Sequence, residues 1–165
     1  MRRYIDRVVT TLKPFTTPLA RVLLSALTRI EKLDESDVKD FDDKEEMIIE
    51  QFEDVFAWES LIYGAILAVF AVLSWQLTAA ESISMQVVGL SLSALGSLSL
   101  ARSSVRGKAG IVANVQETAS RQFNAATKSI PDEGALRAKC RNTVHGVFGA
   151  LILAAGFIVQ ITASV

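Results

Sequence analysis

Three long stretches of this chain contain no Asp, Glu, Lys or Arg. They cover residues 60–79, 82–101 and 143–165, which are 20, 20 and 23 residues long. At about 1.5 Å of rise per residue, 20 helical residues cover roughly the 30 Å hydrocarbon core of a bilayer. Helices satisfy their backbone hydrogen bonds internally, which the water-free core requires. The sequence therefore predicts an all-α integral membrane protein with three transmembrane helices.

The first two stretches are separated only by Ala80 and Glu81, which predicts a tight antiparallel hairpin. The hairpin tip carries no cation, but five cations lie near the opposite ends of the second and third stretches. These are Arg102, Arg106, Lys108, Lys139 and Arg141. Cytoplasmic loops carry an excess of Lys and Arg, so residues 1–59 and 102–142 are expected in the cytoplasm, with the N-terminus inside and the C-terminus outside. Cys140 should then resist an impermeant maleimide in intact cells and react after lysis.

Charge lies in zones outside these stretches. The net charge is +5 in residues 1–30, −10 in residues 31–59 and +5 in residues 102–142, and Glu81 completes the total of −1. Five segments follow from this pattern. They are basic amphipathic in-plane helices (1–33), an acidic linker with the cytoplasmic part of a long helix (34–59), the transmembrane hairpin (60–101), a basic cytoplasmic helical segment (102–142) and the third transmembrane helix (143–165).

The basic N-terminal segment has apolar residues at helical spacing on both sides of Pro14 and Pro18. Proline interrupts the hydrogen bonding of a helix interior, so the pattern predicts two amphipathic helices separated by these prolines. Two placements fit equally well. The helices lie in the plane of an anionic leaflet, where each surface cation contributes about 1 kcal/mol, or they fold back onto the protein's own cytoplasmic helices. Membrane lipid, anionic in the first case, is an expected partner.

The carboxylate-rich residues 34–46 lack the Gly and the regular ligand positions of a calcium-binding EF-hand loop. The segment is therefore interpreted as an acidic linker that ends in a helix start, where Asp42 and Glu45 occupy the positions of a capping box. Helical spacing continues from there without Gly or Pro to Ser60. A single long helix is expected over residues 43–79.

The cytoplasmic half of this long helix has an apolar stripe that needs a partner. The stripe consists of Ile48, Phe52, Val55 and Phe56. The segment after the second apolar stretch repeats apolar residues at the same spacing, including Val112, Val115 and Phe123. These residues are the expected cytoplasmic docking surface, for one another, for a sister protomer or for a protein partner.

A third long helix is expected before the last apolar stretch. Ser129, Pro131, Asp132 and Glu133 resemble a helix start, with Pro in the first turn and early acidic residues. From this point the helix is expected to run to the C-terminus.

Small residues at four-residue spacing occur in all three apolar stretches, a pattern that lets membrane helices pack closely. The expected packing and oligomerisation residues are Gly64, Ala68, Gly89, Ser93, Gly96, Ser97, Gly146, Ala150 and Ala154. Either these residues pack three helices within one protomer, or one set remains for self-association. Because three helices rarely use three small faces, a homo-oligomer is expected.

Few polar groups in the apolar stretches are candidates for chemistry. His145 is expected to form hydrogen bonds at the membrane interface rather than to relay protons. Cys140 is the only cysteine and lies five residues from this histidine, and the pair lacks the further ligands of a closed metal site. No spacing indicates a nucleophile beside a base, a cofactor site or a nucleic-acid surface. No catalytic, cofactor-binding or metal residue is assigned, and enzymatic activity is not expected.

Two functions fit these features. The first is a non-catalytic membrane scaffold or accessory subunit that self-associates, docks a protein partner through its cytoplasmic helices, or does both. The alternative is an oligomeric ion channel or holin-like pore-forming protein, with the polar intramembrane residues Ser93, Ser97 and His145 along its path. The first is preferred, because hydroxyls in a packed helix can bond to their own backbone carbonyls.

Overall fold

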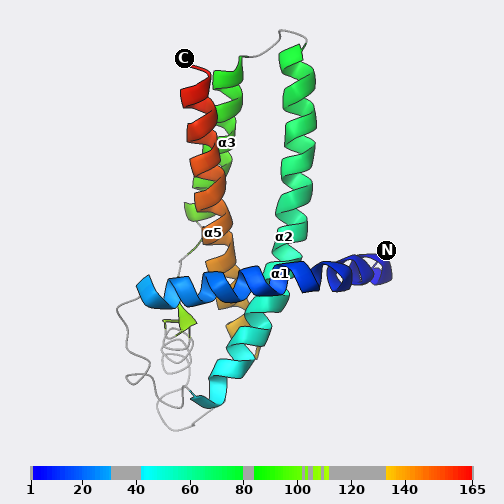
Figure 1. Cartoon of the computed structure of the whole chain (residues 1–165), viewed down its shortest axis with the longest axis vertical. Helices are drawn as coiled ribbons and strands as arrows, with labels where there is room; N and C mark the ends of the chain where they lie inside the picture. The colour runs from blue at the N-terminus through cyan, green and yellow to red at the C-terminus, as the bar shows by residue number, and fades with distance from the viewer. Residues whose placement is uncertain are drawn as a thin grey trace. The chain divides into compact units, whose positions relative to one another are not determined.

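The computed structural model of this 165-residue chain describes residues 2–30, 42–79, 84–101, 103, 106–108, 110–111 and 133–164. The helices in this part of the chain are α1 (Arg2–Ile30), α2 (Asp42–Ala79), α3 (Met85–Ala101) and α5 (Glu133–Thr162), as Figure 1 shows. The described residues contain no strand. The all-α class is therefore confirmed for them.

Two long helices lie where the sequence predicts them. The helix predicted over residues 43–79 is α2, which begins at Asp42, and the helix predicted to run to the C-terminus is α5. The second apolar stretch forms α3, whose described length is 17 residues. Residues 80–83, which include the predicted hairpin tip, lie outside the described residues, as do the docking residues Val112, Val115 and Phe123.

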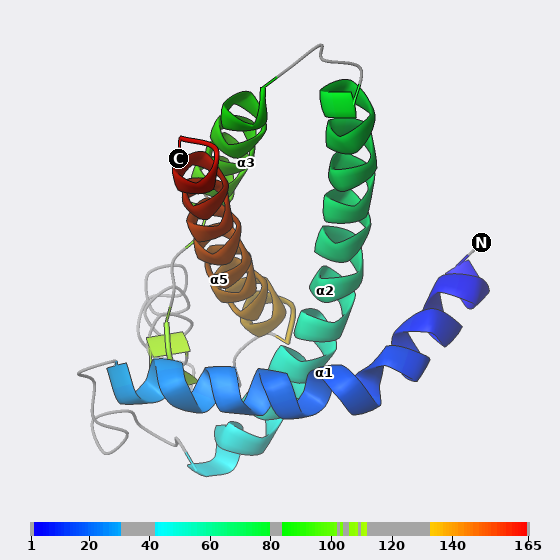
Figure 2. The ribbon, with the colours of Figure 1, turned by 45° about the horizontal axis from the view of Figure 1, so that its top comes forward.

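The N-terminal helix corrects one prediction, because α1 is a single helix that runs through Pro14 and Pro18. It changes direction in its N-terminal half instead of breaking, as Figure 2 shows. Each proline removes one N–H from the helix ladder, which is a common cause of a bend. The hydroxyl of Thr16, between the prolines, donates to the carbonyl of Leu12 at 3.2 Å, a contact that often adds to such a bend.

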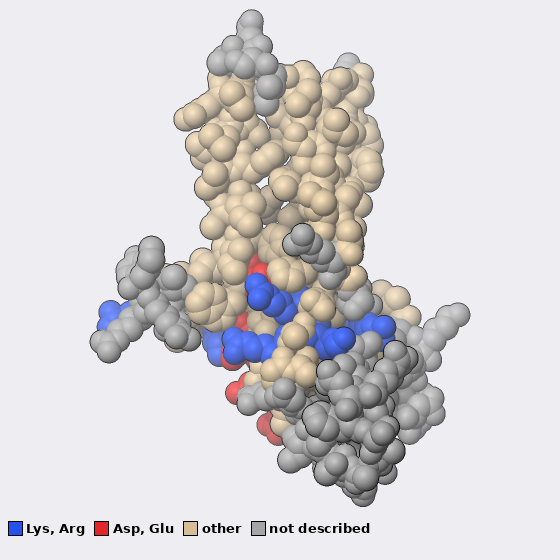
Figure 3. Space-filling model, turned by 180° about the vertical axis from the view of Figure 1, so that it is seen from behind, with Lys and Arg blue, Asp and Glu red and all other residues tan. Residues whose placement is uncertain are grey.

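The chain divides into two compact units, which we name the charged unit and the apolar unit. The charged unit consists of Met1–Glu59 and Val105–Thr143, and the apolar unit of Ser60–Ser104 and Val144–Val165. The N-terminal parts of α2 and α5 belong to the charged unit and their C-terminal parts to the apolar unit. Among its described residues, the apolar unit has no Asp, Glu, Lys or Arg. The Lys and Arg side chains visible in Figure 3 belong to the charged unit.

Apolar side chains from several helices form the core of the charged unit. The buried ones are Val9, Ala20 and Leu24 of α1, Ile48, Phe52, Val55, Phe56 and Ala57 of α2, Ile111, and Leu136 and Cys140 of α5. In both ribbon views α1 lies across the N-terminal part of α2 (Figures 1 and 2). The three buried apolar residues of α1 share one helical face, which we call the inner face. The inner face of α1 is therefore folded back onto the protein's own helices.

In the apolar unit, α3 and α5 lie side by side (Figures 1 and 2) with their backbones in contact. A Cβ added at Gly96 of α3 would lie 2.7 Å from the carbonyl oxygen of Gly149 of α5. A Cβ at Gly89 would lie 2.9 Å from the carbonyl oxygen of Gly156. Real Cβ atoms do not approach other atoms so closely, so these positions require glycine.

Two described helices, α2 and α5, are long and apolar enough to cross a membrane by length and composition. Of the most apolar 18 consecutive residues in each helix, only 22 % in α2 and 28 % in α5 are buried inside the molecule. The core helix of a water-soluble domain buries its apolar surface against other elements. These two helices instead leave most of their apolar surface uncovered, which favours membrane association.

Candidate functional site

A polar cluster joins three helices of the apolar unit. The hydroxyl of Tyr63 on α2 lies 2.6 Å from the Oγ of Ser99 on α3 and 2.7 Å from the Nδ1 of His145 on α5. The Ser99 hydroxyl also donates to the backbone carbonyl of His145 at 3.2 Å. Phe148 stacks on the Tyr63 ring at a centroid distance of 4.7 Å. The cluster therefore fixes the positions of all three helices at one level.

The three hydrogen bonds of this cluster determine which nitrogen of His145 carries a proton. Ser99 uses its single hydrogen on the carbonyl, so the hydroxyl of Tyr63 must donate to Ser99. Tyr63 then has no second hydrogen to give, and His145 must donate from Nδ1. This pattern leaves the Nε2 of a neutral His145 as a hydrogen-bond acceptor. The cluster connects helices through hydrogen bonds, and the partner of the His145 ring is a tyrosine on another helix.

We expect the Tyr63→Phe variant to lose about 1–3 kcal/mol of unfolding free energy, because two partly buried groups lose their partner while the ring remains. Thermal unfolding in detergent measures this loss. Ser91→Ala is the matched control, since its exposed hydroxyl bonds only to the Val87 carbonyl of its own helix. Equal unfolding midpoints for the two variants would show that the cluster does not join the helices.

The serines predicted to line a path do not share one environment. Ser93 is buried and accepts a hydrogen bond from the Gln160 side chain of α5 at 2.9 Å. Ser97 is exposed, and its hydroxyl donates to the Ser93 carbonyl at 2.9 Å. One serine therefore contributes to packing between helices, and the other bonds to its own helix.

The small residues also separate into two groups. Gly89, Ser93, Gly96 and Gly146 are buried. Gly64, Ala68, Ser97, Ala150 and Ala154 are exposed, and a Cβ at Gly64 would meet nothing within 4 Å. Within the chain, α5 contacts α3 through Gly149 and Gly156, which the four-residue spacing did not select. The exposed set is not used for packing between the described helices.

Ion pairs connect the helices of the charged unit. Lys13 and Arg21 of α1 pair with Asp54 and Glu53 of α2, both at 2.5 Å. These pairs, together with the buried inner face, join α1 to the N-terminal part of α2. All four side chains are partly exposed, so each pair contributes about 1 kcal/mol or less to stability.

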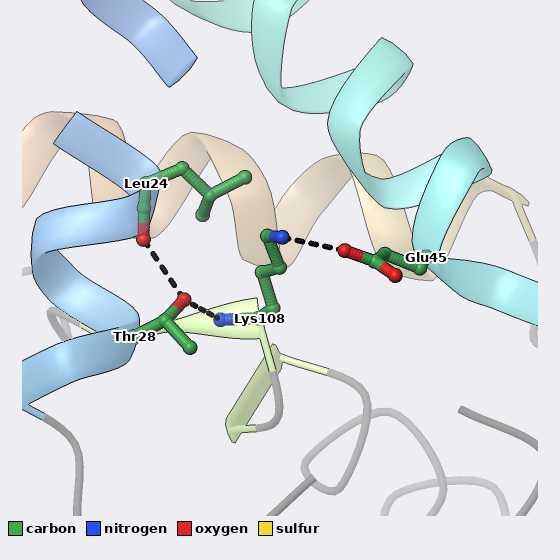
Figure 4. Close-up of polar contacts among 4 residues, drawn as sticks. All are labelled: Leu24, Thr28, Glu45 and Lys108. Atoms are coloured by element: carbon green, nitrogen blue, oxygen red, sulfur yellow. Dashed lines mark hydrogen bonds and ion pairs between the residues drawn. The ribbon is translucent and has the colours of Figure 1, made fainter. Parts of the chain in front are cut away.

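Lys108 joins two helices, one through its side chain and the other through its backbone, as Figure 4 shows. Its ammonium lies 2.6 Å from a carboxylate oxygen of Glu45 on α2. Its backbone N–H donates to the hydroxyl of Thr28 on α1 at 3.3 Å, and that hydroxyl donates to the Leu24 carbonyl at 2.9 Å. Lys108 therefore anchors the start of the basic segment to α1 and α2.

A further ion pair in the charged unit involves a buried carboxylate. The side chain of Glu59 on α2 is only 4 % exposed and accepts a hydrogen bond from the Nε of Arg141 on α5 at 2.7 Å. Burying a charge is costly unless a counter-charge compensates it. Arg141 therefore supplies the counter-charge of the buried Glu59 carboxylate.

The predicted docking stripe lies in the interior of the charged unit. Ile48 and Phe52 are fully buried, and Val55 and Phe56 are nearly so. The rings of Phe52 and Phe56 stack at 6.3 Å. In this structure the stripe packs against the protein's own residues and is not accessible to a second molecule.

Cys140 is unsuitable as a topology probe, contrary to the expectation from sequence. It is fully buried in the charged unit, and burial raises the pKa of its thiol to about 12 from 9.0. The thiolate is the reactive form, so the native thiol is inert at neutral pH. Because the fold favours the neutral thiol, its contribution to stability is complete below about pH 9 and is lost as pH rises towards 12.

We expect Cys140 in the folded protein to remain unlabelled by maleimide after lysis at neutral pH, and to react after denaturation. Mass spectrometry of the intact protein measures the label. A Ser25→Cys variant, with its cysteine at an exposed position of α1, is the positive control. Labelling of native Cys140 as fast as the cysteine introduced at position 25 would contradict the burial described here.

Comparison with family models, curated proteins and solved structures finds no match to this chain.

Proposed function

We propose that the chain is an integral membrane protein with spans at residues 60–79, 82–101 and 143–165, its charged unit in the cytoplasm and its C-terminus outside. Most of the apolar surface of α2 and α5 is not buried inside the molecule. This supports the membrane placement, since such a surface needs an apolar solvent. The described part of the middle span, α3, has 17 residues and would extend about 26 Å, near the lower limit for a spanning helix. The absence of Asp, Glu, Lys and Arg from the described apolar unit supports the same placement.

Single cysteines in a Cys140→Ala background test this topology. Ala80→Cys places a thiol at the proposed outer tip, and Ser25→Cys places one on the cytoplasmic α1. An impermeant maleimide should label position 80 in intact cells and position 25 only after lysis. Labelling of position 25 in intact cells would reverse the orientation, and release of the protein by alkaline carbonate would refute the spans.

We further propose that the protein is a non-catalytic scaffold or accessory subunit that self-associates, docks partners through its cytoplasmic helices, or does both. Any docking would use a surface other than the buried stripe of Ile48, Phe52, Val55 and Phe56. One observation carries the self-association. Gly64 and Ala68 lie one turn apart on α2, and both are exposed. Apart from the adjoining part of its own helix, no described residue lies within 4 Å of a Cβ at Gly64. Small residues at this spacing let two membrane helices approach closely, so this face of α2 suits a second copy.

Disulfide crosslinking in native membranes tests this contact. Ala68→Cys, in the Cys140→Ala background, should give a crosslinked dimer on mild oxidation. Ile66→Cys is the matched control, because Ile66 is also exposed but lies on the opposite side of α2. Equal crosslinking at both positions would indicate random collision, and no crosslink at position 68 would remove α2 from the interface.

A scaffold fits the serines better than a channel does, because each described intramembrane serine singled out above already bonds to protein. We therefore expect Ser97→Leu to leave assembly unchanged and to have no effect on ion flux in reconstituted vesicles. Ser97 is the cleaner choice for this test, since Ser93 packs against α5 and its replacement would disturb the fold. Measurable flux that the Ser97→Leu variant abolishes would favour a channel.

A further inference from the structure

α1 has a second apolar face. It is exposed, because α1 packs against the protein through its inner face. The residues of the second face follow one another at intervals of three or four, which places them on one side of the helix. They are Phe15, Leu19, Val22, Ala26 and Ile30, and we call them the outer face. The four large side chains are between 62 % and 77 % exposed. A helix of a water-soluble unit rarely exposes such a continuous apolar face without a partner for it.

The cations of α1 whose side chains the structure describes have two different environments. Lys13 and Arg21 are held by carboxylates of α2. Arg7 and Arg29 are exposed, and neither forms an ion pair with another described residue. Arg29 lies beside the outer face, and Arg7 precedes its N-terminal end, before the two prolines. The outer face is therefore apolar, with a cation beside its C-terminal end and another before its N-terminal end.

We propose that the outer face of α1 lies in the surface of an anionic bilayer, while the inner face holds α1 to α2. An apolar face bordered by arginine is the pattern of a helix that lies in the membrane plane. The inference rests on the membrane placement proposed above. It means that α1 attaches the charged unit to lipid at a site separate from the spans.

Charge favours lipid over a second copy as the occupant of the outer face. In a two-fold interface each residue meets the same surface of its partner. The outer face of a second copy holds no Asp or Glu that could pair with Arg7 or Arg29. A second copy therefore offers these arginines no counter-charge on that face, whereas an anionic leaflet neutralises them.

A fluorescent label at Leu19 tests the proposal in the full chain. Leu19→Cys in the Cys140→Ala background carries an environment-sensitive NBD group, and the protein is reconstituted in vesicles of phosphatidylcholine with or without phosphatidylglycerol. The emission should shift to the blue in anionic vesicles and be quenched by lipids that carry a spin label near the headgroup. Ser25→Cys is the matched control, since Ser25 is exposed but faces Arg21, Glu45 and Glu46 rather than the outer face. Its emission should remain that of a label in water.

Charge reversal gives the second readout. Replacing both Arg7 and Arg29 by Glu should lower the ratio of membrane-bound to unbound α1 in anionic vesicles by at least about 25-fold, since each lost cation accounts for about 5-fold. In neutral vesicles the change should be small. A label at position 19 that stays in water in both lipids would overturn the proposal, and a shift that grows with protein density would assign the face to a second copy. Resistance to carbonate extraction should persist in every variant. A failure of the proposal for the outer face can therefore be distinguished from a failure of the proposed spans.

Discussion

Replacing Gly96 by Leu is expected to separate α3 from α5 and to lower the unfolding free energy by about 3 kcal/mol, the upper end of the range for overpacking. A single Cβ at this position already lies 2.7 Å from the Gly149 carbonyl oxygen. Backbone atoms cannot move aside as the end of a flexible side chain can. The helices must therefore part, which also weakens the hydrogen bond from Gln160 to Ser93.

Gly64→Leu is the matched control for this variant. Both glycines lie inside apolar helices, but a Cβ at Gly64 would meet nothing within 4 Å. Thermal unfolding of the detergent-solubilised monomer should show a lower midpoint for Gly96→Leu and an unchanged or higher midpoint for Gly64→Leu, because replacing Gly relieves a backbone cost of about 1 kcal/mol. Equal losses from both variants would contradict the close contact of α3 and α5.

Removal of Arg141 is the second substitution with a large expected effect. Arg141→Ala leaves the buried carboxylate of Glu59 without this cation, and breaking a buried pair costs about 3–5 kcal/mol. Because Arg141 itself is 58 % exposed, water screens part of the interaction, and a loss near the lower limit is expected. Denaturant unfolding of the solubilised protein measures it.

A double variant separates the loss of the pair from a general loss of packing. Glu59→Gln combined with Arg141→Ala removes the charge that the arginine compensates, so it should recover most of the lost stability. Lys13→Ala is the surface comparison, since its pair with Asp54 is exposed on both sides and should contribute about 1 kcal/mol or less. If the double variant is as unstable as Arg141→Ala, the Glu59 charge is not the cause.

The long helices were predictable because each rests on a local pattern. The charge-free stretches, the capping residues near Asp42 and the early acidic residues at Glu133 all act within a few residues of the feature that they specify. The prolines of α1 also act locally, but their effect depends on the surroundings. A proline weakens a helix without ending it when tertiary contacts hold both sides, and α1 is held at Lys13 and Arg21, on either side of its prolines.

The packing face of α5 shows why a simple spacing rule did not select the residues of α5 that contact α3. Steps of four residues drift by about 40° around a helix of 3.6 residues per turn. Gly146, Ala150 and Ala154 therefore turn gradually away from one side, and the two alanines are exposed. Alternating steps of four and three remain on one side, as Gly149 and Gly156 do. The same reasoning separates the buried Gly96 from the exposed Ser97 on α3.

The polar cluster and the ion pairs could not be read from the sequence, since their partners are distant in the chain. Tyr63 and His145 are separated by 82 residues, and Lys108 and Glu45 by 63. A tyrosine in an apolar helix has an ordinary role in packing, and nothing near Tyr63 in the chain indicates a polar partner. A search for polar residues at matching distances from the ends of the three apolar stretches could have paired it with Ser99 and His145.

Native mass spectrometry of the protein, extracted from its own membrane in mild detergent, tests the scaffold most directly. We expect a defined complex of two or more copies, with or without a different protein, that dissociates when Gly64 and Ala68 are both replaced by Leu. The same preparation in vesicles should carry no ion flux. A monomer without partners would contradict the scaffold, and a closed homo-oligomer that conducts ions would establish the channel in its place.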